Sequence, residues 1–159
     1  MSRKSTARIE KSTTRSHRSH VSKGFPSSGC WINLFDPIVG ELVGACDYDC
    51  AMIDMEHSAV SLESTLTMIR AVQLSGAKAF VRAPDKHTVW VGQLMDMGAD
   101  GVMVPMVNSV EEAEALALAS FYAPKGTRGM AAGIVRATGY GVHTEEYLKN
   151  HRKLSLIHI

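Results

Sequence analysis

The sequence lacks the features that mark several large classes of protein. No run of apolar residues approaches the ~20 that a helix needs to span a bilayer, so no membrane-spanning helix is expected. Neither a G-x-G-x-x-G nor a G-x-x-x-x-G-K-[ST] pattern occurs, which removes the usual indication of a nucleotide-binding sheet. The three cysteines show no C-x-x-C spacing. They are expected to be buried, reduced thiols of an intracellular protein, with a metal-binding pair of Cys46 and Cys50 as the alternative.

Basic charge is concentrated at the start of the chain. Residues 1–23 carry seven of the 17 Lys and Arg residues but one of the 16 acidic residues, so the rest of the chain is mildly acidic. An acidic body argues against a nucleic-acid-binding surface there. Residues 1–27 hold too few large apolar residues to offset their ordering entropy. We interpret this segment as a disordered basic tail. A transit peptide and a stretch wrongly included in the reading frame are alternatives.

From residue 28 onward, short apolar runs alternate with longer helical patterns. This alternation predicts an α/β domain with a parallel sheet, built from about four strand–helix units in residues 28–159. The predicted strands are 30–34, 51–54, 79–82 and 101–105, and the predicted helices are 37–45, 62–74, 87–97 and 110–121. On these residues alone two architectures remain open: an open doubly wound sheet and the first half of a barrel.

Polar residues gather where the predicted strands end. Asp54 ends the second strand and is followed by His57, while Arg82 ends the third. In a barrel the carboxyl ends of the strands converge on one mouth, where an imidazole beside a carboxylate can serve as a base. An arginine there can bind a carboxylate or stabilise an oxyanion. A plainer interpretation is also open: a strand end with a helix-capping acid, a surface arginine, and Asp96 in an ordinary turn.

Six segments in order resemble the HpcH/HpaI family of class II pyruvate aldolases. They are GCW, AMIDMEHSAV, FVRAP, QLMDMGADGVMVPMVNSVEEAEA, FYAPKGTRGM and RATGYG with EEYL, between about residues 29 and 150. The resemblance implies the first half of a (β/α)₈ TIM barrel, with Arg128 and Gly129 shaping its mouth. A citrate-lyase-type acyl-CoA lyase and a non-catalytic half-barrel module are the alternatives, and the Glu-His and Gly-x-Arg-Gly motifs favour the aldolase.

The resemblance also implies a reaction and a set of roles. The family cleaves 4-hydroxy-2-oxo acids to pyruvate and an aldehyde through a pyruvate enolate, with a divalent cation such as Mg²⁺, Mn²⁺ or Co²⁺. His57 matches the general base, and Asp96 matches the carboxylate that raises the basicity of that histidine. Arg82 matches the residue that binds the substrate and stabilises the enolate. Asp54 matches a supporting active-site acid, and Glu56 belongs to the motif without an assigned step.

The family's metal ligands, a Glu and an Asp at the ends of the fifth and sixth strands, have no counterpart before Ile159. Residues 154–159 resemble the opening of a fifth strand, or a non-native scar. The resemblance therefore implies an N-terminal fragment that is inactive by itself. Its expected partners are a small 2-oxo acid and an aldehyde, with no nucleic acid or membrane, in a homo-oligomer of the complete protein. A cytoplasmic location is expected, or an organellar one if residues 1–27 are a transit peptide.

The composition of residues 1–27 makes a first prediction. Deleting this segment leaves the melting temperature of the remaining chain almost unchanged, because the segment has no apolar face with which to pack. The measurement is thermal unfolding of the two chains, followed by circular dichroism. A large drop in melting temperature on deletion would show that the segment packs against the domain.

Overall fold

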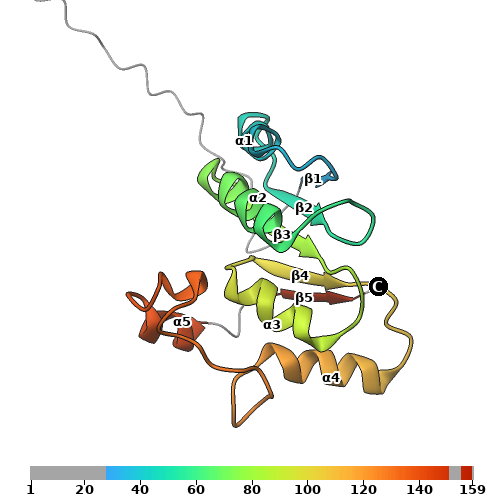
Figure 1. Ribbon diagram of the computed structural model, residues 1–159, viewed down its shortest axis with the longest axis vertical. Helices are drawn as coiled ribbons and strands as arrows, with labels where there is room; N and C mark the ends of the chain where they lie inside the picture. Colours follow the sequence, from blue (N-terminus) through green and yellow to red (C-terminus); the bar gives the residue numbers. More distant parts are fainter. Residues whose placement is uncertain (1–27, 151–154, 159) are drawn as a thin grey trace, which may run out of the picture.

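The computed structural model describes residues 28–150 and 155–158 (Figure 1), so the predicted tail 1–27 lies outside the described residues. Five parallel strands form one sheet in the order β1-β2-β3-β4-β5, which is also their order in the chain. A doubly wound sheet reverses its strand order partway, and this sheet does not, which favours the barrel alternative. The strands are β1 (Gly29–Ile32), β2 (Cys50–Asp54), β3 (Lys78–Arg82), β4 (Gly101–Val104) and β5 (Ser155–His158).

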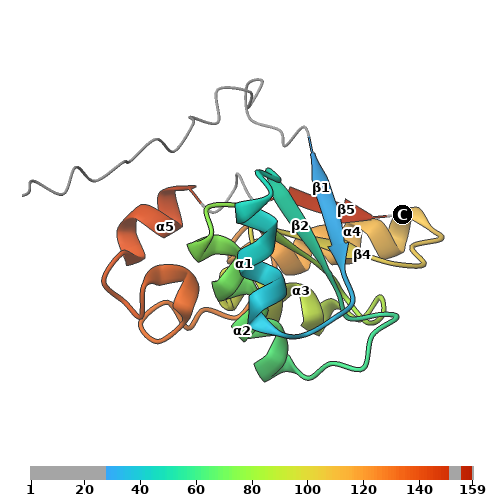
Figure 2. The ribbon, with the colours of Figure 1, turned by 90° about the horizontal axis from the view of Figure 1, so that it is seen from above.

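A helix follows each of the first four strands, and these helices pack on one face of the sheet (Figure 2). This arrangement is the outcome of consecutive right-handed crossovers between parallel neighbours. The helices are α1 (Pro37–Ala45), α2 (Leu62–Leu74), α3 (Thr88–Asp96) and α4 (Val110–Ser120), followed by the 3₁₀ turn η1 (Arg136–Thr138) and α5 (Thr144–Asn150).

Local capping explains why the predicted helix boundaries lie close to the observed ones. The side chains of Asp36, Ser61 and Ser109 accept hydrogen bonds from backbone N–H groups two or three residues further on, at 2.9, 3.2 and 3.2 Å. These bonds satisfy donors that a helix N-terminus otherwise leaves unpaired. Gly76 and Gly98, just past α2 and α3, have φ values of +92° and +82°, which glycine adopts without steric cost.

The two faces of the sheet have different environments. Ile53, Val81 and Val104 point toward the helices and are fully buried in the main core. On the opposite face Trp31, Met52 and Phe80 lie in register across β1, β2 and β3. Two residues further along the strands, the same face carries the polar residues that end β2 and β3.

The structure adds elements that the sequence pattern left unassigned. The turn η1 and helix α5 follow the four strand–helix units and lie beyond the amino ends of the strands (Figure 1). The fifth strand suggested by residues 154–159 is present as β5, and it pairs in parallel with β4. No helix within the described ranges has the length and apolar character that crossing a membrane requires.

Close packing between α1 and α2 gives a second prediction. A Cβ added to Gly44 would overlap the backbone oxygen and the side chain of Ser75. Gly44→Ala therefore lowers the free energy of unfolding by about 1–3 kcal/mol, although alanine is the better helix former. Urea unfolding at neutral pH measures the change, with Glu41→Ala on the exposed side of the same helix as the control. A stability gain in Gly44→Ala would contradict this close approach of the two helices.

Candidate active site

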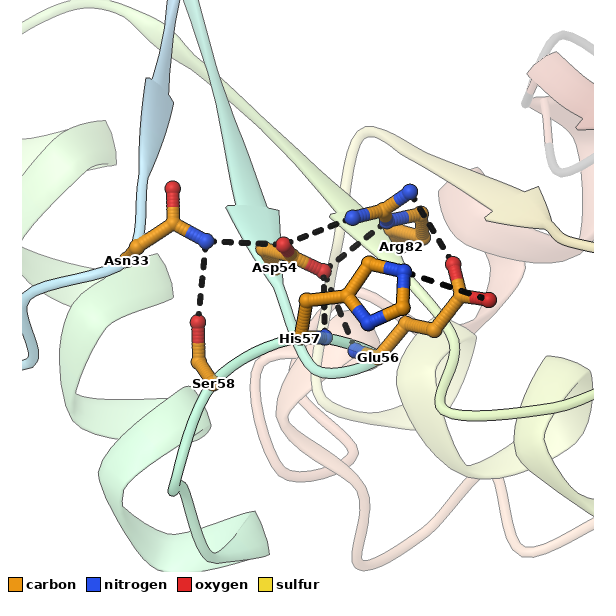
Figure 3. Close-up of polar contacts among 6 residues, drawn as sticks. All are labelled: Asn33, Asp54, Glu56, His57, Ser58 and Arg82. Atoms are coloured by element: carbon orange, nitrogen blue, oxygen red, sulfur yellow. Dashed lines mark hydrogen bonds and ion pairs between the residues drawn. The ribbon is translucent and has the colours of Figure 1, made fainter.

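Asp54 and Arg82 form a bidentate ion pair where β2 and β3 end (Figure 3). The two residues are directly opposite in the parallel register. Arg82 donates from Nε to Oδ1 of Asp54 at 2.8 Å and from Nη2 to Oδ2 at 2.7 Å. The planar guanidinium group matches the two oxygens of a carboxylate in this geometry. The structure therefore brings these two side chains together at the carboxyl ends of neighbouring strands, as the sequence predicts.

The Asp54 carboxylate is saturated with hydrogen bonds. Besides Arg82 it accepts from Nδ2 of Asn33 at 2.8 Å and from the backbone N–H groups of Glu56 and His57 at 3.0 and 3.3 Å. Its side chain is 1% exposed. Burial by itself raises the pKa of Asp54, but the bonds from Arg82, His57, Glu56 and Asn33 outweigh burial and lower the pKa to about 2. Asp54 is thus an anionic anchor for its neighbours and is poorly suited to act as a base.

The same carboxylate shapes the turn that follows β2. By accepting from the N–H groups of Glu56 and His57, Asp54 folds the D-x-E-H segment back over the strand end. Asn33, just after β1, also donates to Oγ of Ser58 at 3.0 Å and so ties this turn to the first strand. The sequence interpretation missed Asn33. Its signal was a polar residue near the end of the predicted strand 30–34, comparable to Asp54 and Arg82 at the ends of theirs.

Glu56 lies between the arginine and the histidine. Its carboxylate forms an ion pair with Nη1 of Arg82 at 3.0 Å and lies 3.8 Å from Nε2 of His57. The imidazole of His57 is 70% exposed, so a ligand can reach it. The structure therefore places a carboxylate beside His57, but this carboxylate belongs to Glu56, which had no assigned step.

Asp96 does not lie beside Asp54 and His57. It ends α3, which runs antiparallel to the strands, so it lies at the opposite end of the sheet from Asp54 and His57. There its Oδ1 accepts from Nη2 of Arg128, a buried side chain that also donates to Tyr147 at 3.1 Å. Among the described residues no ion pair joins Asp96 to His57, and Arg128 does not lie at the mouth. The sequence contained a signal for this, because the predicted helix 87–97 puts Asp96 in its last turn, and a helix that follows a parallel strand ends beside the amino ends of the strands.

The described residues do not form a metal site. No group of three or more His, Cys, Asp or Glu side chains within them could hold a metal ion. Both oxygens of Asp54 are already engaged by hydrogen bonds, and Glu56 is paired with Arg82. Because a divalent cation needs several oxygen ligands, these two acids by themselves do not fit one. Cys30, Cys46 and Cys50 are free thiols in the structure. Cys46 is exposed and the other two are partly buried, so the expectation that all three are buried is wrong.

Comparisons with known proteins found a matching family and similar curated proteins. The model of the family described as HpcH/HpaI aldolase/citrate lyase matches residues 27–154. The hydroxypyruvate/pyruvate aldolase of Agrobacterium fabrum is 37% identical over 120 residues, which is 76% of this chain and 45% of that protein. The 4-hydroxy-2-oxovalerate aldolase of Novosphingobium aromaticivorans is 35% identical over 127 residues, 79% of this chain and 48% of that protein.

A solved structure of an HpcH/HpaI aldolase/citrate lyase family protein from Burkholderia cenocepacia J2315 superposes with a TM-score of 0.75 at 28% sequence identity. The match covers 84% of this chain and 54% of that chain, which confirms the prediction of a half-barrel. The chain spans about half the length of the curated relatives it matches.

The bonds to Asp54 give a third prediction. The carboxyl group titrates near pH 2 in the folded protein and near 3.9 in the unfolded chain. Because the folded pKa is the lower one, the ionised pair stabilises the fold above about pH 4, by roughly 2 kcal/mol, and this contribution is lost as the pH falls toward 2. NMR of the Asp54 carboxyl carbon measures the midpoint, and Arg82→Met is expected to raise it. A midpoint near 4 in the unsubstituted protein would contradict the prediction.

Proposed function

Because the chain belongs to the HpcH/HpaI aldolase/citrate lyase family, we propose that it forms the N-terminal half of the site of a divalent-metal-dependent aldolase. The reaction is cleavage of a 4-hydroxy-2-oxo acid to pyruvate and an aldehyde. The observation that carries the proposal is the anchored Asp54–Arg82 pair with the accessible imidazole of His57 beside it. The names of the relatives, hydroxypyruvate/pyruvate aldolase and 4-hydroxy-2-oxovalerate aldolase, support a small 2-oxo acid as the ligand. We also propose that the complete protein is a homo-oligomer located in the cytoplasm.

His57 is the group that moves the proton in this reaction. It accepts the proton of the 4-hydroxyl group, by way of water, while the C3–C4 bond breaks and the aldehyde leaves. The electron pair of that bond becomes the pyruvate enolate, which is then protonated at C3. The Glu56 carboxylate lies 3.8 Å from Nε2 of His57.

Arg82 supplies fixed positive charge where the enolate oxygen develops. Its hydrogen bond to Asp54 is the main cause that raises its pKa, so it remains a cation. Asp54 holds two of its nitrogens in a rigid fork, which means that little reorganisation is needed when negative charge forms. Arg82 thus serves both to bind the 2-oxo acid and to stabilise the enolate.

The divalent cation of the proposed enzyme, Mg²⁺, Mn²⁺ or Co²⁺, acts when bound as a Lewis acid that polarises the keto oxygen. The described residues do not hold such an ion. His57, Arg82 and Asp54 act through their own side chains, and their proposed roles do not depend on holding the cation. They are tested in a protein that supplies the remaining half of the site.

A chimera provides that test. Residues 29–150 replace the corresponding segment of the hydroxypyruvate/pyruvate aldolase of Agrobacterium fabrum, and pyruvate release from a 4-hydroxy-2-oxo acid is measured with Mn²⁺. His57→Ala lowers kcat by about 10²–10⁴-fold, as loss of a general base does, and leaves pyruvate binding intact. Arg82→Lys lowers kcat and weakens pyruvate binding, because lysine lacks the planar fork.

Two controls accompany the chimera. His87→Ala removes another exposed histidine, which pairs with Asp85 and has no role in the reaction, so kcat is unchanged. The 159-residue chain measured alone shows no metal-stimulated release. Proton exchange at the methyl group of pyruvate gives a second readout, since it requires enolisation without carbon–carbon cleavage. Normal cleavage and exchange rates in His57→Ala would refute the role of His57 as the base.

A further inference from the structure

An aromatic contact at the mouth has no role in the chemistry described so far. The guanidinium carbon Cζ of Arg82 lies 4.6 Å from the centroid of the Trp31 ring. Trp31 is on β1 and Arg82 on β3, so the two side chains meet across β2. The register explains this, because Trp31 aligns through Met52 with Phe80, two residues before Arg82 on the same face. The indole therefore lies close enough for a cation–π contact.

The contacts of Arg82 are of two kinds: ion pairs with two carboxylates, and one contact with an aromatic ring. Asp54 binds the edge formed by Nε and Nη2, and Glu56 pairs with Nη1. These contacts all lie at the edge of the guanidinium group and leave its two faces free of polar partners among the described residues. The Trp31 ring adds a contact of another kind, because a guanidinium over an aromatic ring restricts movement toward the ring, and arginine makes such contacts more readily than lysine.

Trp31 lies on edge strand β1, on the sheet face that the half-barrel leaves uncovered. Phe80, in the same row of the sheet face, is 8% exposed, whereas Trp31 is 51% exposed. In this half-barrel Trp31 is thus partly exposed while its ring contacts the arginine. A tryptophan in this place buries less apolar surface than one in the core, so its contribution to folding is correspondingly smaller.

We infer that Trp31 is a positioning residue that holds the guanidinium plane of Arg82 in the orientation needed to receive a carboxylate or enolate oxygen of a 2-oxo acid. The ligand in this inference rests on the proposed function, while the stacking does not. Trp31 acts through Arg82 and takes no part in proton transfer. Substituting it therefore affects affinity for an anionic ligand and leaves the general base unchanged.

The first experiment tests the stacking in the 159-residue chain, without any ligand. Protons near the face of an indole are shifted upfield by its ring current, so the δ-CH₂ and Nε–H signals of Arg82 are shifted in the unsubstituted chain. Trp31→Leu abolishes these shifts and Trp31→Phe retains part of them. Trp90→Phe is the matched control: it replaces the other tryptophan, whose Nε1 donates to Asp85 at 2.9 Å, and leaves the Arg82 signals in place. Unchanged Arg82 signals in Trp31→Leu would overturn the stacking.

The second experiment tests the positioning role in the same chains. Oxalate, a planar analogue of the pyruvate enolate, is titrated while the Arg82 Nε–H signal is followed. Trp31→Leu weakens binding by about 3- to 30-fold, the range that a cation–π contact of ordinary strength gives, and Trp31→Phe restores most of it. Trp31→Met, which keeps apolar bulk without a ring, behaves as Trp31→Leu does. Thermal unfolding of each variant shows that the fold is retained.

The outcomes are distinguishable. Lost ring-current shifts together with weaker oxalate binding in both ring-free variants support the inference. Lost shifts with unchanged oxalate affinity overturn the positioning role and leave the proposed function standing. An unsubstituted chain that binds no oxalate overturns the ligand of the inference, whereas the proposed function is decided separately by pyruvate release from the chimera.

Discussion

The buried carboxylate of Asp54 is the interaction on which the arrangement of the mouth depends. It receives donors from the segment after β1, from the turn after β2 and from the end of β3, so one anion joins three consecutive strands. A buried carboxylate without partners is strongly unfavourable. Removing one partner of a buried pair typically costs about 3–5 kcal/mol. This shared partner consequently couples the positions of Asn33, Arg82 and the D-x-E-H turn. A change in the position of one affects the positions of the others.

The opposite end of the sheet carries a separate polar network with a structural purpose. Arg136 of η1 donates to Oε1 of Gln73 at 2.7 Å and to the carbonyl of Met97 at 2.9 Å. Gln73 in turn donates to Asp100 at 2.8 Å, and Asp100 accepts from the backbone of Ala79 at 2.9 Å. These bonds attach the segment after α4 to the amino ends of β3 and β4. Polar side chains thus join the elements at both ends of the sheet, and the exposed imidazole of His57 lies at the carboxyl end.

The parts of the structure that the sequence predicted well are those set by local chemistry. Helix α2 was predicted at its observed bounds, Leu62–Leu74, because Ser61 caps its start and Gly76 follows its end. The meeting of Asp54 and Arg82 followed from strand ends in a parallel sheet. The contacts missed are long-range ones. Asn33 bonds to Asp54 across 21 residues, and Asp96 turns to Arg128 across 32 residues, and neither pairing is encoded in a local pattern.

The state of Arg82 sets a condition on any ligand of this mouth. An arginine has five N–H donors, and the two hydrogen bonds to Asp54 use only Nε and one proton of Nη2. The remaining donors are on Nη1 and Nη2, and Nη1 is already close to the Glu56 carboxylate.

A ligand carboxylate that approaches this edge meets the negative charge of Glu56 as well as the positive charge of Arg82. Its binding free energy therefore combines attraction to Arg82 with repulsion from Glu56. A ligand that brings a cation into the site reduces this repulsion, because the cation offsets the negative charge of Glu56. Glu56, to which the sequence assigned no step, consequently couples the affinity of Arg82 for an anion to the charge of its surroundings.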